Sequence, residues 1–508
     1  MRDPAFGNPA VDALSRAGVI DVGSNSVRFV VFDGAARSPA CFYNEKVMCR
    51  LGAGLPETGR LNPRGRARAL AALARFQAVA TQICDHPPTA VATAALREAQ
   101  DGPEFCAEVR HDIGLDLRII DGLEEARLSA QGVLLGWPGS VGLVCDMGGA
   151  SLEMARIGND GVGRRLTLGL GPLKLRGLQG GQRGRRAYID TVLGEAAAVL
   201  GQDSILGQDS GRLFLVGGSW RAIVRIDMER QNYPLRVLHG YRLEATAVRR
   251  IAAFIKSMPP EILRMRCGLS AGRLEFVPYA LEVLLGILRH FRPREIALSS
   301  HGIREGLLYE QMPKALRRRD PLLEACRFAE MQNARLPGCG KVLFAFIKPL
   351  FQAAPPRKMR LINAACLLHD VHWQTNPDYR TQACLDIATR VDLGGLTHAE
   401  RVFLGLALLH RYRSRRKDTA FAPLQDLVGA TPQREAEILG KALRFGAMMW
   451  MRGDAPMGTL AWKPKKRHLR VQLPQSARAL MSEGAGARLQ SLVDVLGGTC
   501  DILYDSAT

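Results

Sequence analysis

The sequence predicts an α/β protein with two similar domains around a cleft, followed by a helical C-terminal region. The first observation is an internal repeat: residues 20–26 (IDVGSNS) and 145–151 (CDMGGAS) each carry Asp after an apolar run, Gly two positions later and Ser five positions later. The second is that another apolar run follows after only a few residues, which is typical of a hairpin of strands. The third is a change to helical periodicity from about residue 320 onward.

These observations define the expected domains. We predict one α/β domain over residues 15–137 and a second over 138–312, with Pro138 and Gly139 marking the boundary. Residues 320–508 are predicted as an all-α region that can divide into two subdomains. Residues 1–14 are predicted to form a disordered tail.

The repeated turn has the composition of a phosphate-binding loop. Glycine lets backbone N–H groups approach an anion, serine adds a hydroxyl donor, and an aspartate at the strand end can hold a divalent cation. A single turn of this kind is common as a purely structural element. Two copies that face each other across a cleft predict a phosphate site.

The remaining elements follow in chain order. In the first domain the pattern predicts a hairpin through residue 32, a helix over 63–83, strands over 90–93 and 117–120, and a helix that opens at residues 121–122. In the second it predicts a hairpin over 141–157, a helix over 188–200 and strands over 213–216 and 296–300. Strand-to-glycine junctions at 217–219 and 302–306 are two further points where backbone could approach phosphate or a ribose.

The composition is that of a folded protein with several domains. The chain has 508 residues, of which 47% are hydrophobic and 23% charged, and this length favours about three or four domains. No apolar run has the length of a signal peptide core or a membrane span, so we expect a cytoplasmic protein with no membrane partner. The 11 cysteines form no CxxC pair and are expected as reduced thiols, so they suggest neither a disulfide framework nor a zinc site.

The formal net charge of +20 predicts a polyanionic partner. Basic residues gather at 183–186, 317–319, 411–417 and 463–467, although any one such cluster is equally consistent with a solvated surface. Nucleic acid is not favoured as the partner, because no binding signature accompanies the charge and aromatic residues amount to only 6%.

Four motifs then resemble one family. Residues 20–28 (IDVGSNSVR), 92–99 (ATAALREA), 122–127 (GLEEAR) and 146–153 (DMGGASLE) occur in the order and form found in the exopolyphosphatase and guanosine pentaphosphate phosphohydrolase family. The resemblance covers about residues 15–310 and extends more loosely over the helical region. Ala150 departs from a third Gly in the family's loop, and Leu123 from the first acid of an acidic triplet. Alanine should fit if its φ is negative.

The resemblance implies an actin-like core of two ribonuclease H-like domains, followed by an HD-like C-terminal region. It implies hydrolysis of the terminal phosphoryl group of inorganic polyphosphate, or of the 5′ γ-phosphate of guanosine pentaphosphate. It also implies that the enzyme uses Mg²⁺ as cofactor and can use a monovalent cation such as K⁺ in addition. A homodimer is the oligomeric state that the resemblance implies.

The resemblance also assigns roles to the motif residues. Glu125, the second acid of its pair, is the expected general base for the attacking water. Asp146 is the expected Mg²⁺ ligand, with Asp21 and Glu153 as helpers. Phosphate oxygens are expected to be bound by Ser24, Asn25, Ser26, Arg28, Arg97, Gly148, Gly149, Ser151, Gly217, Gly218 and Ser219.

Structural explanations compete with these roles. Glu124 and Glu125 lie in the first turn of a helix, where the helix dipole alone favours acids. Arg28 could face solvent or pair with an acid on its strand. Arg127 cannot face Glu125 on a helix, because it lies two residues away, and is expected to form a structural ion pair.

His369 and Asp370 resemble the metal-binding pair of HD-type phosphohydrolases. A functional site of that type needs further ligands, including an earlier histidine, and none occurs between residues 310 and 369. We therefore expect a degenerate site in which the pair makes a polar contact between helices. His410, beside a basic run, is expected at the surface.

The helical region is expected to extend an electropositive channel that holds a chain substrate, with binding that weakens as salt rises. The channel residues would be Arg411, Arg413, Arg415, Arg416, Lys417, Lys463, Lys465, Lys466 and Arg467. This charge favours an exopolyphosphatase, while guanosine pentaphosphate hydrolysis stays open because the same cleft accepts both substrates in the family. A third hypothesis is a nucleotide-gated actin-like protein that binds nucleic acid, against which the retention of Glu125 and both aspartates argues.

Overall fold

The structure is a computed structural model that describes residues 16–34, 36–201, 211–412, 421–449 and 457–505. The described chain forms two compact units. The first runs to Tyr233 and includes Leu238–Arg319, and the second contains Pro234–Val237 and the residues from Asp320 onward. The predicted tail at 1–14 lies outside the described residues.

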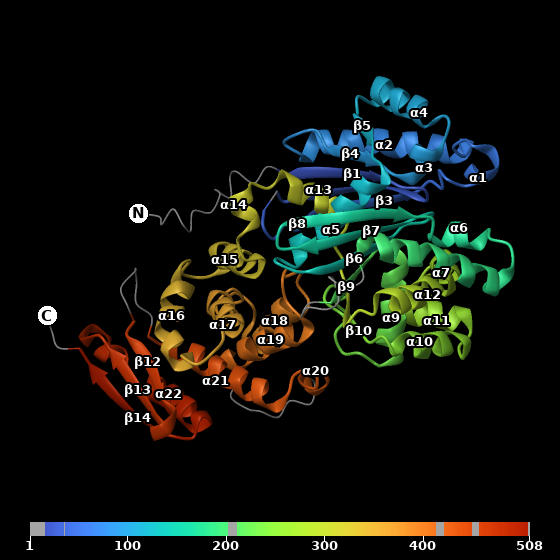
Figure 1. The fold of residues 1–508 in the computed structure, drawn as a ribbon. Helices are drawn as coiled ribbons and strands as arrows, with labels where there is room; N and C mark the ends of the chain where they lie inside the picture. The colour runs from blue at the N-terminus through green and yellow to red at the C-terminus, as the bar shows by residue number, and fades with distance from the viewer. Residues whose placement is uncertain (1–15, 35, 202–210, 413–420, 450–456, 506–508) are drawn as a thin grey trace. The chain divides into compact units, whose positions relative to one another are not determined.

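The first sheet of unit one has the strand order β3-β2-β1-β4-β5 (Figure 1). Its strands are β1 (Ala17–Val22), β2 (Ser26–Phe32), β3 (Cys41–Met48), β4 (Thr89–Ala92) and β5 (Leu117–Ile119). The first three are antiparallel, and β4 and β5 add in parallel. Strands β1 and β2 are rich in buried Val, Ile and Phe, which pack well on a pleated surface.

The second sheet repeats this topology in the order β10-β11-β9-β6-β7-β8. Its strands are β6 (Gly142–Met147), β7 (Leu152–Gly158), β8 (Gly161–Leu168), β9 (Arg212–Val216), β10 (Arg242–Leu243) and β11 (Glu295–Leu298). The two hairpins even share a register, because Asp21 is opposite Arg28 in the first and Asp146 is opposite Glu153 in the second. The internal repeat in the sequence is therefore a repeat of actin-like domains, as predicted.

Helices cover these sheets. Those of unit one are α1 (Leu55–Thr58), α2 (Pro63–Ile83), α3 (Ala94–Glu98), α4 (Gly102–Glu108), α5 (Gly122–Gly136), α6 (Pro172–Arg176), α7 (Gly181–Leu200), α9 (Gly218–Arg230), α10 (Ala247–Lys256), α11 (Pro260–Cys267), α12 (Ala271–Phe291), α13 (Ile303–Gln311) and α14 (Lys314–Arg317). Helix α2 begins with Pro63, and the Asn62 side chain accepts a hydrogen bond from the Gly65 N–H, a standard helix start.

Helices α5 and α13 cross in close contact because both carry glycine at the crossing. A Cβ on Gly306 would lie 1.9 Å from the Leu128 carbonyl oxygen, and one on Gly132 would lie 2.2 Å from the Gly302 carbonyl oxygen. Larger side chains would push the helices apart. The crossing fixes the first turn of α13 beside α5, which carries Glu125.

The described part of the second unit is mainly helical up to residue 446, and one more helix follows near its end. Its helices are α15 (Pro321–Asn333), α16 (Cys339–Ile347), α17 (Pro356–Leu368), α18 (Pro377–Thr389), α19 (His398–Tyr412), α20 (Ala422–Gln425), α21 (Ala430–Gly446) and α22 (Glu483–Leu496). These helices bury one continuous hydrophobic core that includes Phe346, Cys366 and Phe445.

The prediction of an all-α C-terminal region is wrong for its last part. Strands β12 (Thr459–Lys463), β13 (His468–Leu473) and β14 (Thr499–Tyr504) form a three-stranded sheet. Leu469, Val471 and Leu473 are buried at alternate positions of β13, which is the period of a half-buried strand. In the sequence, this short apolar alternation is difficult to recognise as a strand because a run of basic residues lies directly beside it. Among the described residues, no helix is both long and apolar enough to cross a membrane.

Candidate active site

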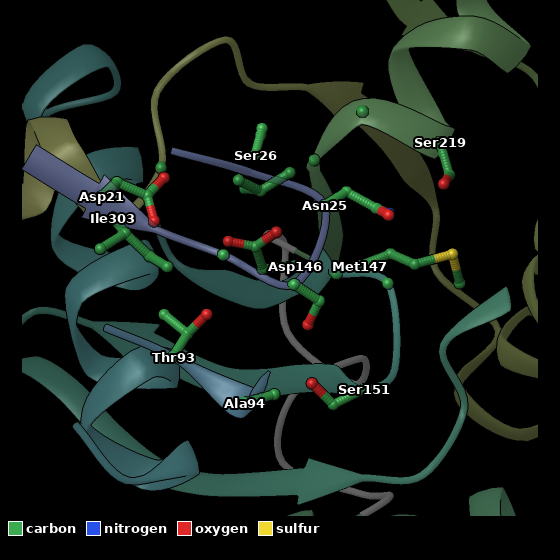
Figure 2. A pocket seen from close by; sticks show the side chains of 18 of the residues that line it. Asp21, Asn25, Ser26, Thr93, Ala94, Asp146, Met147, Ser151, Ser219 and Ile303 are labelled. Atoms are coloured by element: carbon green, nitrogen blue, oxygen red, sulfur yellow. The ribbon is translucent and has the colours of Figure 1, made fainter. Parts of the chain in front are cut away.

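One cleft of unit one brings together the two repeated turns (Figure 2). Of the predicted residues, it is lined by Asp21, Ser24, Asn25, Ser26, Arg28, Glu125, Asp146, Gly148, Gly149, Ser151, Gly217, Gly218 and Ser219. Arg97 and Glu153 do not line the cleft, but both lie close to residues that do. The folding of the two domains thus gathers residues that are far apart in the sequence.

The two turns are held in the same way by backbone hydrogen bonds. The Gly23 N–H donates to the Ser26 carbonyl oxygen at 3.0 Å, and the Gly148 N–H donates to the Ser151 carbonyl oxygen at 3.1 Å. Ala150, which replaces a glycine, does not have a positive φ. The loop therefore tolerates alanine there, as expected.

Glu125 lies in the first turn of α5, but it does not cap this helix. Asp121 is the N-cap, and its side chain accepts a hydrogen bond from the Glu124 N–H at 2.7 Å. Glu125 is 6% exposed, and its Oε2 lies 3.4 Å from Nη1 of Arg97. Burial and then the charges of Glu153 and Asp146 raise the pKa of Glu125 well above its usual value. A buried carboxyl of raised pKa that lines a cleft is a candidate general base.

Glu124, the neighbouring acid, has a different environment. It is ion-paired with Arg127 at 2.7 Å, and Arg127 also contacts Glu310 at 2.7 Å. The expected structural ion pair of Arg127 is confirmed. The two adjacent acids are therefore distinguished by burial and partner rather than by their place in the sequence.

Asp21 and Asp146 occupy equivalent strand ends and both reach the cleft. Burial raises the pKa of each carboxyl. Asp146 Oδ2 accepts a hydrogen bond from the Ser129 hydroxyl, which is fully buried on α5 one turn after Glu125. One helix thus holds Glu125 and a donor to Asp146.

The residues fit a magnesium ion held together with substrate. In the part of the chain that the structure describes, no three His, Cys, Asp or Glu residues lie close enough to form a metal site by themselves. Mg²⁺ usually takes one or two carboxylates and completes its shell with water and substrate phosphates, and Asp21 with Asp146 supply that number. Glu153 is 1% exposed; Thr167 donates to its Oε1 at 3.1 Å, whereas its Oε2 has no hydrogen-bond partner.

Several residues of the cleft were not predicted. The basic side chains Lys46, Arg221, Arg273 and Arg304 line it, and with Arg28 they are called the basic set below. Arg304 lies within the junction at 302–306, and Arg221 lies two residues after the junction at 217–219, so a search for cations at those junctions would have found both. Lys46 comes from β3 and Arg273 from α12, where no motif marks them.

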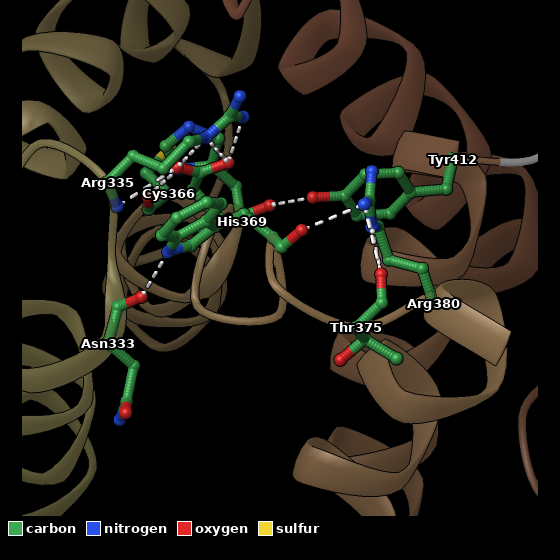
Figure 3. A network of polar contacts seen from close by, with 9 residues as sticks. Asn333, Arg335, Cys366, His369, Thr375, Arg380 and Tyr412 are labelled. Carbon is green, nitrogen blue, oxygen red and sulfur yellow. Dashed lines mark hydrogen bonds and ion pairs between the residues drawn. The ribbon is translucent and has the colours of Figure 1, made fainter. Parts of the chain in front are cut away.

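The predicted degenerate HD-like site lies in unit two, and its groups are engaged with each other (Figure 3). Arg335 Nε donates to Asp370 Oδ2 at 2.9 Å, and His369 Nδ1 lies 2.7 Å from the Cys366 carbonyl oxygen. The Tyr412 hydroxyl donates to the His369 carbonyl oxygen at 3.0 Å. These contacts support a packing role for the pair. His410 is 8% exposed, so its predicted surface position is wrong; it packs against α21, where a Cβ on Gly440 would lie 2.4 Å from the His410 Cβ.

The predicted channel residues are only partly described. Arg411 lies near the end of α19, and Lys463, Lys465, Lys466 and Arg467 lie at the turn between β12 and β13. Arg413, Arg415, Arg416 and Lys417 lie outside the described residues. Whether these side chains form a channel stays a prediction.

The fold and cleft define a protein with two actin-like domains and a cleft lined by duplicated hairpin turns. A sequence profile of the Ppx/GppA phosphatase family matches residues 30–315, and one described as exopolyphosphatase, C-terminal, matches residues 353–503. The chain therefore belongs to the Ppx/GppA phosphatase family and is a hydrolase that acts on phosphoanhydrides.

Related proteins carry two different names. Guanosine-5'-triphosphate,3'-diphosphate pyrophosphatase of Aeromonas hydrophila is 26% identical over 461 residues, which is 87% of this chain and 89% of that protein. Exopolyphosphatase 1 of Mycobacterium tuberculosis is 26% identical over 313 residues, 58% of this chain and 88% of that protein.

Solved structures are similar in fold. The Ppx/GppA family member of Aquifex aeolicus gives a TM-score of 0.50 at 22% identity, covering 58% of this chain and 97% of its own. An exopolyphosphatase of Cytophaga hutchinsonii gives 0.51 at 20% identity, covering 58% and 96%. At these identities the likeness establishes the fold alone.

Proposed function

We propose that this protein is an exopolyphosphatase that releases terminal orthophosphate from inorganic polyphosphate, with Mg²⁺ bound at Asp21 and Asp146. The observation that carries the proposal is the composition of the cleft, where two phosphate loops, a buried glutamate and five basic side chains meet. Phosphoryl transfer depends mainly on positioning and charge stabilisation, which such a set supplies.

In the proposed mechanism the two loops bind the terminal phosphoryl group through backbone N–H groups and the hydroxyls of Ser24, Ser26 and Ser151. Glu125 accepts a proton from the attacking water, and its raised pKa makes it a stronger base than an exposed glutamate. Arg97 orients Glu125 from 3.4 Å. Mg²⁺, when bound at the two aspartates, would neutralise charge on the phosphate oxygens.

Charge and side-chain type support a polyphosphate chain over a nucleotide. The basic set adds five positive charges beyond the loops, more than one terminal phosphate needs. Of the described residues that line the cleft, only Phe276 is aromatic, so the cleft offers little surface for stacking a base. The net charge of +20 also suits a long polyanion.

The alternative substrate is guanosine pentaphosphate. The relative from Aeromonas hydrophila is named for guanosine 5′-triphosphate 3′-diphosphate, which is guanosine pentaphosphate, and it matches along 87% of this chain. The same loops and Glu125 would serve that reaction. A homodimer and a requirement for K⁺ are further proposals that the substrate question does not decide.

The test is Mg²⁺-dependent phosphate release by the full chain. Long polyphosphate and guanosine pentaphosphate are compared at matched concentrations of terminal phosphate and at several salt concentrations, with Glu125→Gln as the inactive control. Faster and salt-sensitive turnover of polyphosphate would support the proposal. Preference for the nucleotide with little salt effect would replace it with the alternative, and equal activity of the control would contradict both.

A further inference from the structure

Ser129 is a polar residue on a buried part of helix α5. It lies one turn after Glu125, and its side chain is fully buried. Its neighbours in the chain, Leu128 and Ala130, are fully buried as well. A buried hydroxyl without a partner is unfavourable, and serine favours the interior of a helix less than alanine does. A serine at this position therefore needs a compensating interaction.

The compensating interaction is a hydrogen bond to a strand of the second sheet. Inside a helix, serine commonly donates to the carbonyl oxygen four residues earlier, which here belongs to Glu125. The Ser129 hydroxyl instead donates to Oδ2 of Asp146, near the end of β6. A hydroxyl carries a single hydrogen, so this bond uses the only donor of the side chain.

The second oxygen of Asp146, Oδ1, has no such partner. In the part of the chain that the structure describes, no group donates a hydrogen bond to it. Gly217 keeps the space beside it clear, because its φ of 112° favours glycine and a Cβ there would lie 3.0 Å from Oδ1. Asp146 lines the cleft. Its carboxylate is therefore held through one oxygen, while the other remains available to a cation.

Asp21, the equivalent aspartate of the first domain, is not held in this way. Among the residues with a described placement, no N–H or hydroxyl group donates to its carboxylate. The two aspartates occupy equivalent places in the repeated hairpins. The difference between them must therefore come from the elements that pack beside the hairpins.

The crossing of α5 and α13 explains this difference. A Cβ on Gly132 would lie 2.2 Å from the Gly302 carbonyl oxygen. A Cβ on Gly306 would lie 1.9 Å from the Leu128 carbonyl oxygen. Each glycine thus contacts the residue four positions before the other glycine, so the serine after Leu128 corresponds to Ile303, the residue after Gly302. Ile303 also lines the cleft (Figure 2), but its side chain has no donor.

We infer that Ser129 is a positioning residue for the cation site: it holds Asp146 through Oδ2 so that Oδ1 can bind the Mg²⁺ proposed above. This inference rests on the proposed function. A hydrogen-bond partner behind a metal-binding carboxylate fixes its orientation, and loss of such a partner typically costs about 10- to 100-fold in metal affinity or activity. Because Ser129 and Glu125 share one helix, a single element orients both the proposed base and the carboxylate.

The binding test uses the full chain without substrate and counts free Mn²⁺, a substitute for Mg²⁺, by electron paramagnetic resonance. Ser129→Ala should weaken Mn²⁺ binding about 10-fold or more, and the helix should still form because alanine is the better helix former. Ser129→Thr keeps the hydroxyl and should bind Mn²⁺ within about 3-fold of the unaltered chain.

Thr389→Val is the matched control for the binding test. Thr389 is also buried, and its hydroxyl donates to the Leu385 carbonyl oxygen at 2.9 Å in unit two. Its replacement removes a buried hydroxyl but should leave Mn²⁺ binding unchanged. Unchanged binding in Ser129→Ala, or equal weakening in both Ser129 variants, would overturn the inference. No Mn²⁺ binding by the unaltered chain would remove the cation site on which the inference rests.

The kinetic test separates positioning from a general disturbance of α5. In Ser129→Ala, the Mg²⁺ concentration for half-maximal phosphate release should rise about 10-fold or more. At saturating Mg²⁺, kcat should fall less than about 3-fold, because Glu125 and the phosphate loops are intact. A displaced helix would move Glu125 and lower kcat even at saturating Mg²⁺. A lower kcat with an unchanged Mg²⁺ requirement would therefore contradict the positioning role.

The two proposals fail in distinguishable ways. If the unaltered chain releases no phosphate from polyphosphate, the proposed function is wrong, while Mn²⁺ binding still tests the role of Ser129. If the chain does release phosphate and Ser129→Ala has a normal Mg²⁺ requirement, only the role of Ser129 is wrong.

Discussion

The candidate active-site cleft and the His369–Asp370 cluster both concentrate charged and polar groups in a folded unit, but the environments of those groups are opposite. In the cleft, Asp21, Asp146 and the basic set stay open to a ligand. In the C-terminal cluster, Asp370 is 2% exposed and engaged by Arg335, while His369 contacts a backbone carbonyl.

The difference shows why the His369–Asp370 pair, in its present contacts, is poorly suited to bind a metal ion. A metal ligand must offer a free lone pair and a place for the ion, and in the cluster a guanidinium already occupies the carboxylate. Burial also lowers the pKa of His369 to about 4, so the imidazole is neutral and serves packing. The cleft instead gathers five basic side chains that a bound anion would stabilise.

The largest expected effect is in the cleft. Glu125→Gln should lower kcat by about 1,000-fold, within the range for loss of a general base, while leaving the fold intact because the amide is the same size. Phosphate release and circular dichroism measure the two. Glu124→Gln, one position away and paired with Arg127, is the control and should keep most of the activity. Loss of activity in both variants alike would remove the distinction between the two acids.

The second largest expected effect is on the Mg²⁺ requirement, which should depend on the cleft and not on the His369–Asp370 cluster. Chelation of Mg²⁺ should abolish phosphate release, and Asp146→Asn should raise the Mg²⁺ concentration needed for half-maximal activity about 10-fold or more, because one charged ligand is lost. Asp370→Asn should leave the Mg²⁺ requirement unchanged. A metal titration followed by both activity and calorimetry measures this, and an effect of Asp370→Asn on Mg²⁺ binding would show an active second site.

Asp370→Asn should act on stability instead. It leaves Arg335 without its carboxylate and should lower the free energy of unfolding by about 1–3 kcal/mol, toward the lower end because Arg335 is 42% exposed. Denaturant unfolding gives the value, and kcat should change less than about 2-fold. A stability unchanged within error would mean that the ion pair contributes nothing.

Glu330, another buried acid of unit two, gives a prediction about how stability depends on pH. Glu330 on α15 is 4% exposed and accepts a hydrogen bond from the Gly340 N–H at 2.6 Å. Burial raises its pKa from 4.5 to about 7. The folded state therefore binds the proton more tightly, so its stabilising contribution is complete below pH 4.5 and is lost as pH rises through about 7.

Glu330→Gln is neutral at every pH and should remove this dependence. We expect the variant to be about 1–3 kcal/mol more stable than the parent at pH 8 and close to it at pH 5. Thermal unfolding at the two pH values measures the difference. Glu324→Gln on the same helix, where Glu324 pairs with Arg327, is the control and should lack the gain at pH 8.

The smallest effect concerns the turn between β12 and β13. Replacing the exposed Lys465 and Lys466 together by Glu should weaken long polyphosphate binding a few-fold and reduce the slope of log affinity against log salt by about 1–2, because fewer counterions are released. Guanosine pentaphosphate turnover should not change. An unchanged salt slope would exclude this turn from the proposed channel.

Local pattern predicted much of the fold. The helix over residues 63–83 appears with those bounds, because Asn62, Pro63 and the apolar period are all local signals. The hairpins and their shared turn were predicted for the same reason. The last sheet was missed because its strands are short. Strands β12 and β13 form a hairpin, whereas β14 joins β13 in parallel only after helix α22, so the helical pattern of the region dominates the sequence there.

The sequence by itself determined the duplicated loops, the pair of equivalent aspartates and the glutamate in the first turn of α5, because each belongs to a short motif of neighbouring residues. Only the tertiary structure decided which of two adjacent acids is buried, and which cations face the cleft. Arg28 and Arg304 are separated by almost the whole of unit one, yet they act on the same aspartate. Electrostatic environment depends on distances through space, and those distances exist only after the sheets have formed and the glycines of α5 and α13 have let the helices meet.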